Sequence, residues 1–143
     1  MIFQLCYTST ATTDLQRQDL VALLTVSRRS NAKAGITGLL LFTADRFVQL
    51  LEGDEAAVRK LYEDIQRDGR HRDVTLVFER QAAARECPDW SMGFQALPES
   101  EWLEFPGTGG ARQGLRPMGG SADRARAMLR AVCERGLDPD RAL

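Results

Sequence analysis

The chain has a single histidine, His71, and three cysteines, Cys6, Cys87 and Cys133, none of which belongs to a CxxC pair. A zinc site, a site with several histidines or a catalytic triad built on histidine is therefore hard to assemble, and we predict no metal site. An odd number of cysteines without paired spacing also argues against a disulfide framework. A reducing, cytoplasmic compartment is the simplest expectation.

Long apolar runs and a strong charge of one sign are absent as well. No run approaches the roughly 18–20 residues of a membrane-spanning helix. The amino terminus, MIFQLCYTS, lacks the basic segment that precedes the apolar part of a secretory signal. Because the formal net charge is −1, electrostatics favour neither nucleic acid nor membranes as partners. The 143 residues, 43% of them hydrophobic, suit one globular domain.

The most informative stretch that is present is a hairpin pattern between residues 36 and 53. Two apolar runs of strand length, 36–42 and 47–51, flank a short polar connection. Gln49 lies in the middle of the second run, on the same strand face as Phe47 and Leu51. A buried amide without partners costs about 1–3 kcal/mol, so we expect a polar group against that face. A structural role, bonded to backbone or at a sheet edge, is the alternative that the pattern by itself favours.

The remaining periodicities predict an α+β protein. Strands are expected at 2–8, 36–42, 47–51, 74–79 and 90–97, and helices at 15–30, 55–67 and 121–135, with Asn31 ending the first helix. The order βαββαββ predicts a ferredoxin-like sandwich, a five-stranded mixed sheet with two helices on one face. Because the strands are apolar on both faces, the other face also needs a cover. The tail helix is available, with an apolar stripe of Ala125, Met128, Leu129, Val132 and Cys133.

Three polar side chains point to ligand recognition. If the helices cover the face that bears Tyr7, then Tyr7, Gln49 and Asn31 lie near one another. These groups form hydrogen bonds but include no base that titrates near neutral pH, which suits a planar heterocycle better than hydrolysis. A core tyrosine with a satisfied hydroxyl is the alternative. Basic residues at 28–33 and 67–72 would hold a pyrophosphate if both groups lay at one end of the helices, or would complement the helix dipoles.

Five short stretches together resemble one family. They are Tyr7 in the first strand, Asn31 before ITG, Gln49 before LLEG, RHRDV at 70–74 and PDWSMGF at 88–94. They are similar, in order along about residues 1–97, to the BLUF domain, a blue-light sensor that binds FAD. The resemblance implies a ferredoxin-like fold with the flavin ring between two helices. It also implies a sensor domain at 1–97 and a helical extension at 98–143 without an effector domain, as in small stand-alone members.

The resemblance implies a role for each matching residue. Tyr7 corresponds to the donor of an electron and a proton to the excited flavin, and Gln49 to the amide that bridges this tyrosine and the flavin. Asn31 corresponds to a ligand of the ring edge, and Trp90 and Met92 to a pair that exchanges positions near Gln49. Which of the two faces inward is left open. The predicted photoactive residues are Tyr7, Gln49, Trp90 and Met92, and the predicted cofactor-binding residues are Tyr7, Leu23, Ser27, Arg28, Asn31, Ile36, Gln49, Ile65, Asp68 and His71.

The implied function is that of a light sensor and not of an enzyme. Rearrangement of Gln49 gives a reversible red-shifted state that is passed to an unidentified partner protein. FAD is the expected cofactor, although shared ring contacts would admit FMN, and homo-oligomerisation is left open. Alternatives are a light-insensitive binding module, and an acylphosphatase-like hydrolase that uses Arg28 and Asn31. A cysteinyl–flavin photoreceptor would need Cys6, which should face away from the Tyr7 side of its strand.

Overall fold

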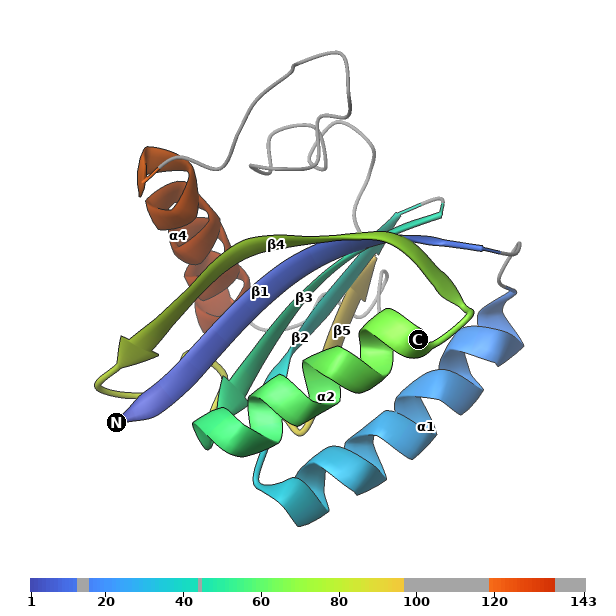
Figure 1. Ribbon diagram of the computed structural model, residues 1–143, viewed down its shortest axis with the longest axis horizontal. Helices are drawn as coiled ribbons and strands as arrows, with labels where there is room; N and C mark the ends of the chain where they lie inside the picture. The colour runs from blue at the N-terminus through green and yellow to red at the C-terminus, as the bar shows by residue number, and fades with distance from the viewer. Residues whose placement is uncertain (13–15, 44, 97–118, 136–143) are drawn as a thin grey trace.

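A computed structural model describes residues 1–12, 16–43, 45–96 and 119–135. The elements are β1 (Ile2–Ala11), α1 (Arg17–Ala34), β2 (Thr37–Thr43), β3 (Arg46–Gly53), α2 (Glu55–Arg67), β4 (His71–Ala82), β5 (Gly93–Ala96) and α4 (Gly119–Arg135) (Figure 1). The sheet order is β4-β1-β3-β2-β5. Strand β5 pairs with β2 in parallel, and the other pairs are antiparallel. This is the predicted ferredoxin-like α+β fold with a five-stranded mixed sheet.

The two faces of the sheet are covered by different helices. Helices α1 and α2 lie on one face and α4 lies on the other (Figure 1). Alternation along the strands divides the buried side chains accordingly. Phe3, Leu5, Tyr7, Leu40 and Phe47 pack with α1 and α2, whereas Cys6, Leu39, Leu41, Val48 and Leu50 pack with Ala125, Leu129 and Val132 of α4. The prediction that the tail helix covers the second face is confirmed. The side chain of Met128 lies outside the described residues.

Helix α1 runs past the position where the sequence predicts its end. Asn31 lies within the helix, and the left-handed residue that ends it is Gly35, at φ 70°. The prediction that Asn31 ends the helix is therefore wrong. Glycine adopts this conformation without the strain that a side chain adds, so it is the stronger stop signal of the two. The amide of Asn31 is instead free to act on another segment.

Long-range pairing changes the predicted lengths of the strands. β1 and β4 extend to Ala11 and from His71 because they pair with each other along almost their whole length. β5 is shorter than predicted and starts only at Gly93. The carbonyl groups of Ser91 and Met92 accept hydrogen bonds from side chains of α1. These two residues therefore belong to the approach to the strand and not to the strand itself.

Helices α1 and α2 run in opposite directions (Figure 1). The basic groups at residues 28–33 and 67–72 each follow the carboxyl end of one helix, so they lie at opposite ends of the helical layer. They cannot form the single pyrophosphate site that a shared end would allow. Within the described ranges, no helix is both long and apolar enough to cross a membrane.

Cys87 and Cys133 are joined by a disulfide across 46 residues of sequence, with their Cα atoms 5.8 Å apart. Cys6 is free and buried. The sequence argument against disulfides is therefore wrong for two of the three cysteines. Sequence spacing did not reveal the pair, because only the packing of α4 on the sheet brings the two residues together.

A buried carboxyl group fastens the segment before β5 to the centre of the sheet. Glu52 of β3 is fully buried. Its two oxygens accept hydrogen bonds from Gln4 Nε2 at 3.0 Å and Thr37 Oγ1 at 3.1 Å, and from the backbone N–H groups of Glu86 at 2.8 Å and Cys87 at 2.7 Å. One side chain thus joins β1, β2, β3 and the segment that leads to β5.

We expect Glu52→Gln to lower the free energy of unfolding by about 2–4 kcal/mol. The amide has one acceptor oxygen in place of two, so two buried donors lose their partner. Urea unfolding followed by circular dichroism measures the loss. The matched control is Glu79→Gln, because Glu79 pairs with Arg59 on the surface. Such pairs contribute about 0–1 kcal/mol. Equal losses in the two variants would contradict the importance given to Glu52.

Candidate functional site

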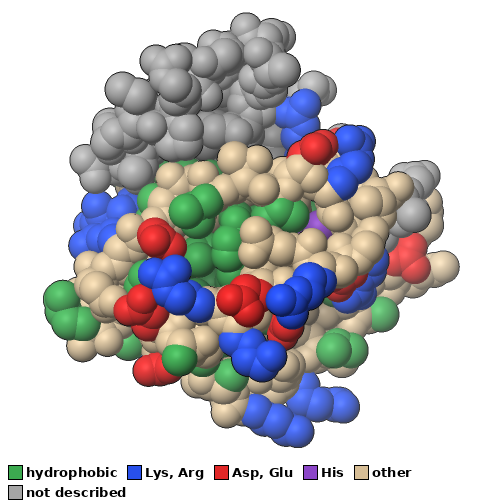
Figure 2. All heavy atoms as spheres, in the orientation of Figure 1, with side chains coloured by type: hydrophobic (Ala, Val, Ile, Leu, Met, Phe, Trp, Pro, Cys, Tyr) green, Lys and Arg blue, Asp and Glu red, His purple; other side chains and the backbone are tan. Residues whose placement is uncertain are grey.

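A cavity of about 190 Å³ opens between the two helices and the sheet. Figure 2 shows the face of the molecule that bears the two helices: hydrophobic side chains gather near its centre, with charged side chains around them and the chain's one histidine close by. The lining residues are Leu23, Leu24, Val26, Ser27, Ser30, Asn31, Leu40, Phe47, Gln49, Leu61, Asp64, Ile65, Asp68, Arg70, His71 and Met92. The cavity is smaller than the roughly 300–1,000 Å³ that bury a whole drug-sized ligand.

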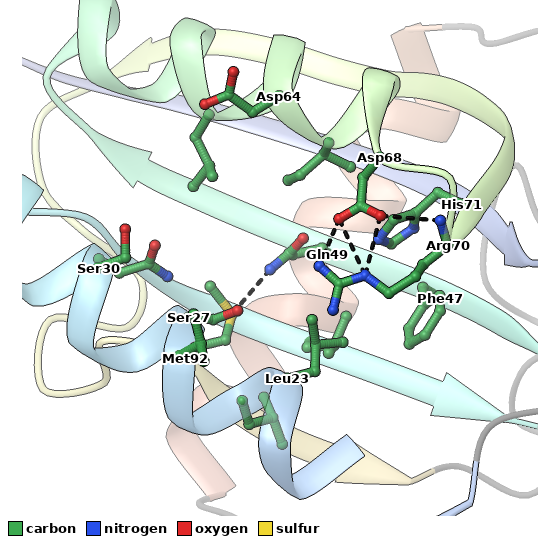
Figure 3. A pocket seen from close by; sticks show the side chains of 16 residues that line it. Leu23, Ser27, Ser30, Phe47, Gln49, Asp64, Asp68, Arg70, His71 and Met92 are labelled. Carbon is green, nitrogen blue, oxygen red and sulfur yellow. Dashed lines mark hydrogen bonds and ion pairs between the residues drawn. The ribbon is translucent and has the colours of Figure 1, made fainter. Parts of the chain in front are cut away.

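Helical spacing explains which side chains form the two walls. Leu23, Ser27 and Ser30 recur along one stripe of α1, and Leu61 and Ile65 along one stripe of α2, while Asp68 follows directly after the end of α2. Each helix thus supplies apolar groups and, towards its carboxyl end, polar ones (Figure 3). Two facing walls with an apolar middle suit a flat ring system whose edges carry hydrogen-bonding atoms.

The bottom of the cavity is a chain of three side chains centred on Gln49. The Tyr7 hydroxyl donates to Gln49 Oε1. Gln49 Nε2 donates to Met92 Sδ at 3.3 Å, and Figure 3 shows Gln49 and Met92 side by side in the cavity. Tyr7 and Gln49 are direct cross-strand partners on β1 and β3. Burial raises the pKa of the Tyr7 phenol, so the hydroxyl keeps its proton and can donate it to the amide.

Helix α1 holds the backbone that carries Met92. Asn31 Nδ2 donates to the carbonyl oxygen of Ser91 at 2.9 Å, and Arg28 Nε donates to that of Met92 at 2.8 Å. Met92 is buried against the cavity side of the sheet, whereas Trp90 packs with the cluster under α4. The inward residue in this structure is therefore Met92. Arg28 and Asn31 use these donors to fix the backbone, which does not favour a hydrolase that would turn them towards a phosphate.

Charged and titratable groups collect at the end of the cavity where α2 meets β4. Arg70 holds the Asp68 carboxylate with several hydrogen bonds, one of 2.6 Å from Nη2. These bonds lower the pKa of Asp68 to about 2. His71 Nδ1 lies 2.8 Å from Ser9 Oγ, and burial lowers the pKa of the imidazole. His71 is therefore neutral at pH 7.

His71 predicts how stability depends on pH. Its pKa is about 6.5 when unfolded and lower when folded, so the unfolded chain binds the proton first. The contribution of neutral His71 to the free energy of unfolding is fully present above pH 6.5. It decreases as the pH drops below that value, by at most about 1.4 kcal/mol per pH unit.

Urea unfolding of the ligand-free protein between pH 5 and 8 measures this slope. We expect His71→Gln to flatten it, since glutamine does not titrate. Asp68 affects a different pH range. The stabilisation that goes with its lowered pKa is lost only as the pH falls from about 4 towards 2, where the carboxylate takes up a proton. An unchanged slope above pH 5 in the variant would show that His71 is not its source.

Seven of the ten residues predicted to bind a cofactor line the cavity: Leu23, Ser27, Asn31, Gln49, Ile65, Asp68 and His71. The other three do not. Tyr7 lies behind Gln49, Ile36 is part of the core on that side of the sheet, and the Arg28 guanidinium reaches the Met92 backbone. Of the predicted photoactive residues, Trp90 also lies away from the cavity.

Several lining residues were absent from the predicted set. Phe47 shares its strand face with Gln49, so alternation alone would have found it. Leu24 and Leu61 extend the helical stripes of residues that were predicted. Arg70 had no usable signal, because its place beside Asp68 depends on the turn between α2 and β4. Cys6 faces the α4 side, as expected, so a thiol–flavin bond from this residue finds no support.

Known proteins with similar sequences identify the family of this chain. The family model described as "BLUF: Sensors of blue-light using FAD" matches residues 2–93. The β subunit of a photoactivated adenylate cyclase from Euglena gracilis is 43% identical over 89 residues, which are 62% of this chain but 10% of that protein. The chain thus spans about a tenth of the curated relatives it matches first.

Solved structures match over most of the chain. The photo-activated state of BlsA has a TM-score of 0.74 at 27% identity, covering 92% of this chain and 96% of that one. The dark state of BlrB, a BLUF protein, has a TM-score of 0.69 at 28% identity, covering 92% and 97%. Because the family model matches well over half of the sequence, on the same strands and helices that form the cavity, this chain belongs to the BLUF family of flavin-binding blue-light sensors.

Proposed function

We propose that light sensing depends on the hydrogen-bonded series Tyr7–Gln49–Met92 at the bottom of the cavity. A thioether sulfur is a weak acceptor, so the Gln49 N–H is held only weakly by Met92. A heterocycle with stronger acceptors in the cavity can compete for that N–H. The observation that carries the proposal is the position of the Gln49 amide, whose oxygen accepts from the Tyr7 hydroxyl and whose N–H donates to the weak acceptor Met92 Sδ.

The residues fit a flavin. Leu23 and Ile65 supply apolar contact from opposite walls, Gln49 supplies an amide at the bottom, and Ser27 lines the side. When bound, the flavin supplies absorption of blue light and an electron acceptor. Tyr7 would be the residue that supplies an electron and a proton to this acceptor, and Gln49, which accepts a hydrogen bond from the Tyr7 hydroxyl, would be the residue whose hydrogen bonds rearrange.

We propose that the cofactor is FAD. The cavity is too small to enclose a whole dinucleotide, so it takes the ring end, and the remainder of the cofactor lies over the surface. The ring contacts alone would also accept FMN. Titration calorimetry with FAD, FMN and riboflavin separates these cases. Equal affinity for all three would contradict a role for the phosphates and the adenosine.

We further propose that the chain is itself non-enzymatic and cytoplasmic, with a sensor at residues 1–97 and a helical extension at 98–143 that passes the signal to a partner protein. The support is the placement of α4 directly on the sheet that holds Gln49. The adenylate cyclase named above is a far longer protein, and nothing in the cavity of this chain calls for nucleotide cyclisation.

Absorbance spectra test the proposal. The purified full chain is loaded with FAD, and spectra are taken before and after blue light. We expect a flavin band that shifts to longer wavelength and returns in the dark. A protein that takes up no flavin, or whose band stays unchanged under illumination, would overturn the proposed function. A light-insensitive binding module would give the second of these results.

A further inference from the structure

Besides the direct packing of α4 on the sheet, one short segment links β3 to α4. Residues 86 and 87 precede the approach to β5, and their backbone N–H groups are held by the buried Glu52 carboxyl group at 2.8 and 2.7 Å. Glu52 lies three residues after Gln49 on the same strand. The segment is therefore fixed to β3 close to the proposed photoactive amide.

The same two residues also hold α4. Glu86 accepts two hydrogen bonds from Arg130, at 3.0 and 2.9 Å, and Cys87 is bonded to Cys133. Arg130 and Cys133 are three residues apart, so they share one face of the helix. Adjacent residues of the segment thus make one ionic and one covalent link to the last turns of α4. The ion pair is partly exposed to solvent, which leaves the disulfide as the stronger of the two links.

We propose that Cys87 and Cys133 form a reversible disulfide, and that its redox state sets how tightly α4 is fastened to the sensor. The oxidant is a low-molecular-weight disulfide. The Cys133 thiolate, in the more exposed residue of the pair, attacks it and releases one thiol. Cys87 then attacks the mixed disulfide and releases the second. Two protein thiols and one small disulfide become one protein disulfide and two small thiols, so electrons and protons balance.

Cys6 provides an internal reference. It is fully buried, and burial raises the pKa of its thiol, so it forms little of the reactive thiolate. It lies on β1, and no disulfide joins it to either of the other two cysteines. The redox response should therefore be confined to the pair.

The consequence for signalling rests on the proposed function. If rearrangement of Gln49 reaches α4 through the segment at 86–92, a disulfide at Cys87 limits how far α4 can respond. The reduced protein is then the form in which light releases the helix, and the oxidised protein is the form in which the helix stays docked. The disulfide holds α4 against the sheet in the dark as well, so this part of the proposal does not depend on a photocycle.

The test uses the full chain loaded with FAD and equilibrated with either oxidised glutathione or excess dithiothreitol. Alkylation after denaturation counts free thiols by mass. We expect one alkyl group on the oxidised protein and three on the reduced protein. Hydrogen exchange of residues 119–135 in the dark should be about tenfold slower or more in the oxidised form. Blue light should raise this exchange in the reduced form alone.

Two variants sharpen the result. Cys133→Ser should exchange at the fast rate under both conditions and carry two alkyl groups throughout. Cys6→Ala should keep the full redox dependence. Three free thiols after oxidation, or equal exchange of α4 in both forms in the dark, would overturn the proposal. Because these two measurements need no light, they stand even if the red shift of the proposed function is absent.

Discussion

Replacing Gln49 with leucine is expected to leave flavin bound while abolishing the light-induced red shift. Leucine keeps the apolar volume at the bottom of the cavity but offers neither an acceptor to Tyr7 nor a donor to Met92. The walls that hold a ring come from α1 and α2 and are unchanged. Loss of the partner of the Tyr7 hydroxyl should also lower the free energy of unfolding by about 1–3 kcal/mol.

Absorbance spectra of the loaded variant, before and after blue light, measure this effect. The matched control is Gln95→Leu, which changes another buried strand glutamine. Its neighbour on β2 is Leu41, a residue of the α4 side, so Gln95 lies outside the cavity. We expect this control to keep its photocycle. A normal red shift in Gln49→Leu would refute the role given to the amide.

Tyr7→Phe is expected to stop the photocycle with little change in flavin affinity. The ring still fills its place between β1 and α2, but the phenol that supplies both an electron and a proton is gone. Tyr7 lies behind Gln49 and does not line the cavity, so contacts to the ring system are preserved. The expected loss of stability is about 1 kcal/mol, the usual contribution of one hydrogen bond.

The chain offers a close control, because its only other tyrosine is a neighbour. Tyr62 lies with its ring centre 5.4 Å from that of Tyr7, and no hydrogen bond joins it to Gln49 among the described residues. We expect Tyr62→Phe to shift and recover as the unmodified protein does. Time-resolved absorbance after a blue flash separates the two variants. Reversible shifting at the normal yield in Tyr7→Phe would remove that residue from the mechanism.

Local periodicity in the sequence was enough to predict which strand residues share one face of the sheet. Alternation in 2–8 and 47–51 placed Gln49 on the same face as Phe47 and Leu51, and placed Cys6 on the opposite face from Tyr7. That the helices cover the face of Tyr7 was a condition, which the structure fulfils. These predictions succeeded because the direction of a side chain depends mainly on residues within one or two turns of it. The resemblance placed Leu23 and Ile65 at the cofactor, and the structure shows both lining the cavity.

What the sequence left open or misplaced depends mostly on how distant segments pack. Whether Met92 or Trp90 faces inward depends on Arg28 and Asn31, which hold the backbone of residues 91 and 92 from about 60 positions away. The end of α1 was misplaced because Asn31 and Gly35 are both acceptable stops. Whether the basic groups at 28–33 and 67–72 share one end of the helical layer stayed open, because the direction of α2 relative to α1 was unknown.

The sequence by itself therefore determined the order of the elements and which strand residues share a face, because hydrophobic periodicity records how side chains alternate along each element. The tertiary structure alone decided that Tyr7 is paired with Gln49 across two strands, that Glu52 holds the segment before β5, and that Cys87 meets Cys133. These contacts join residues that are 34 to 46 positions apart, and no local pattern specifies them. They form only when the whole sheet and its covering helices have packed.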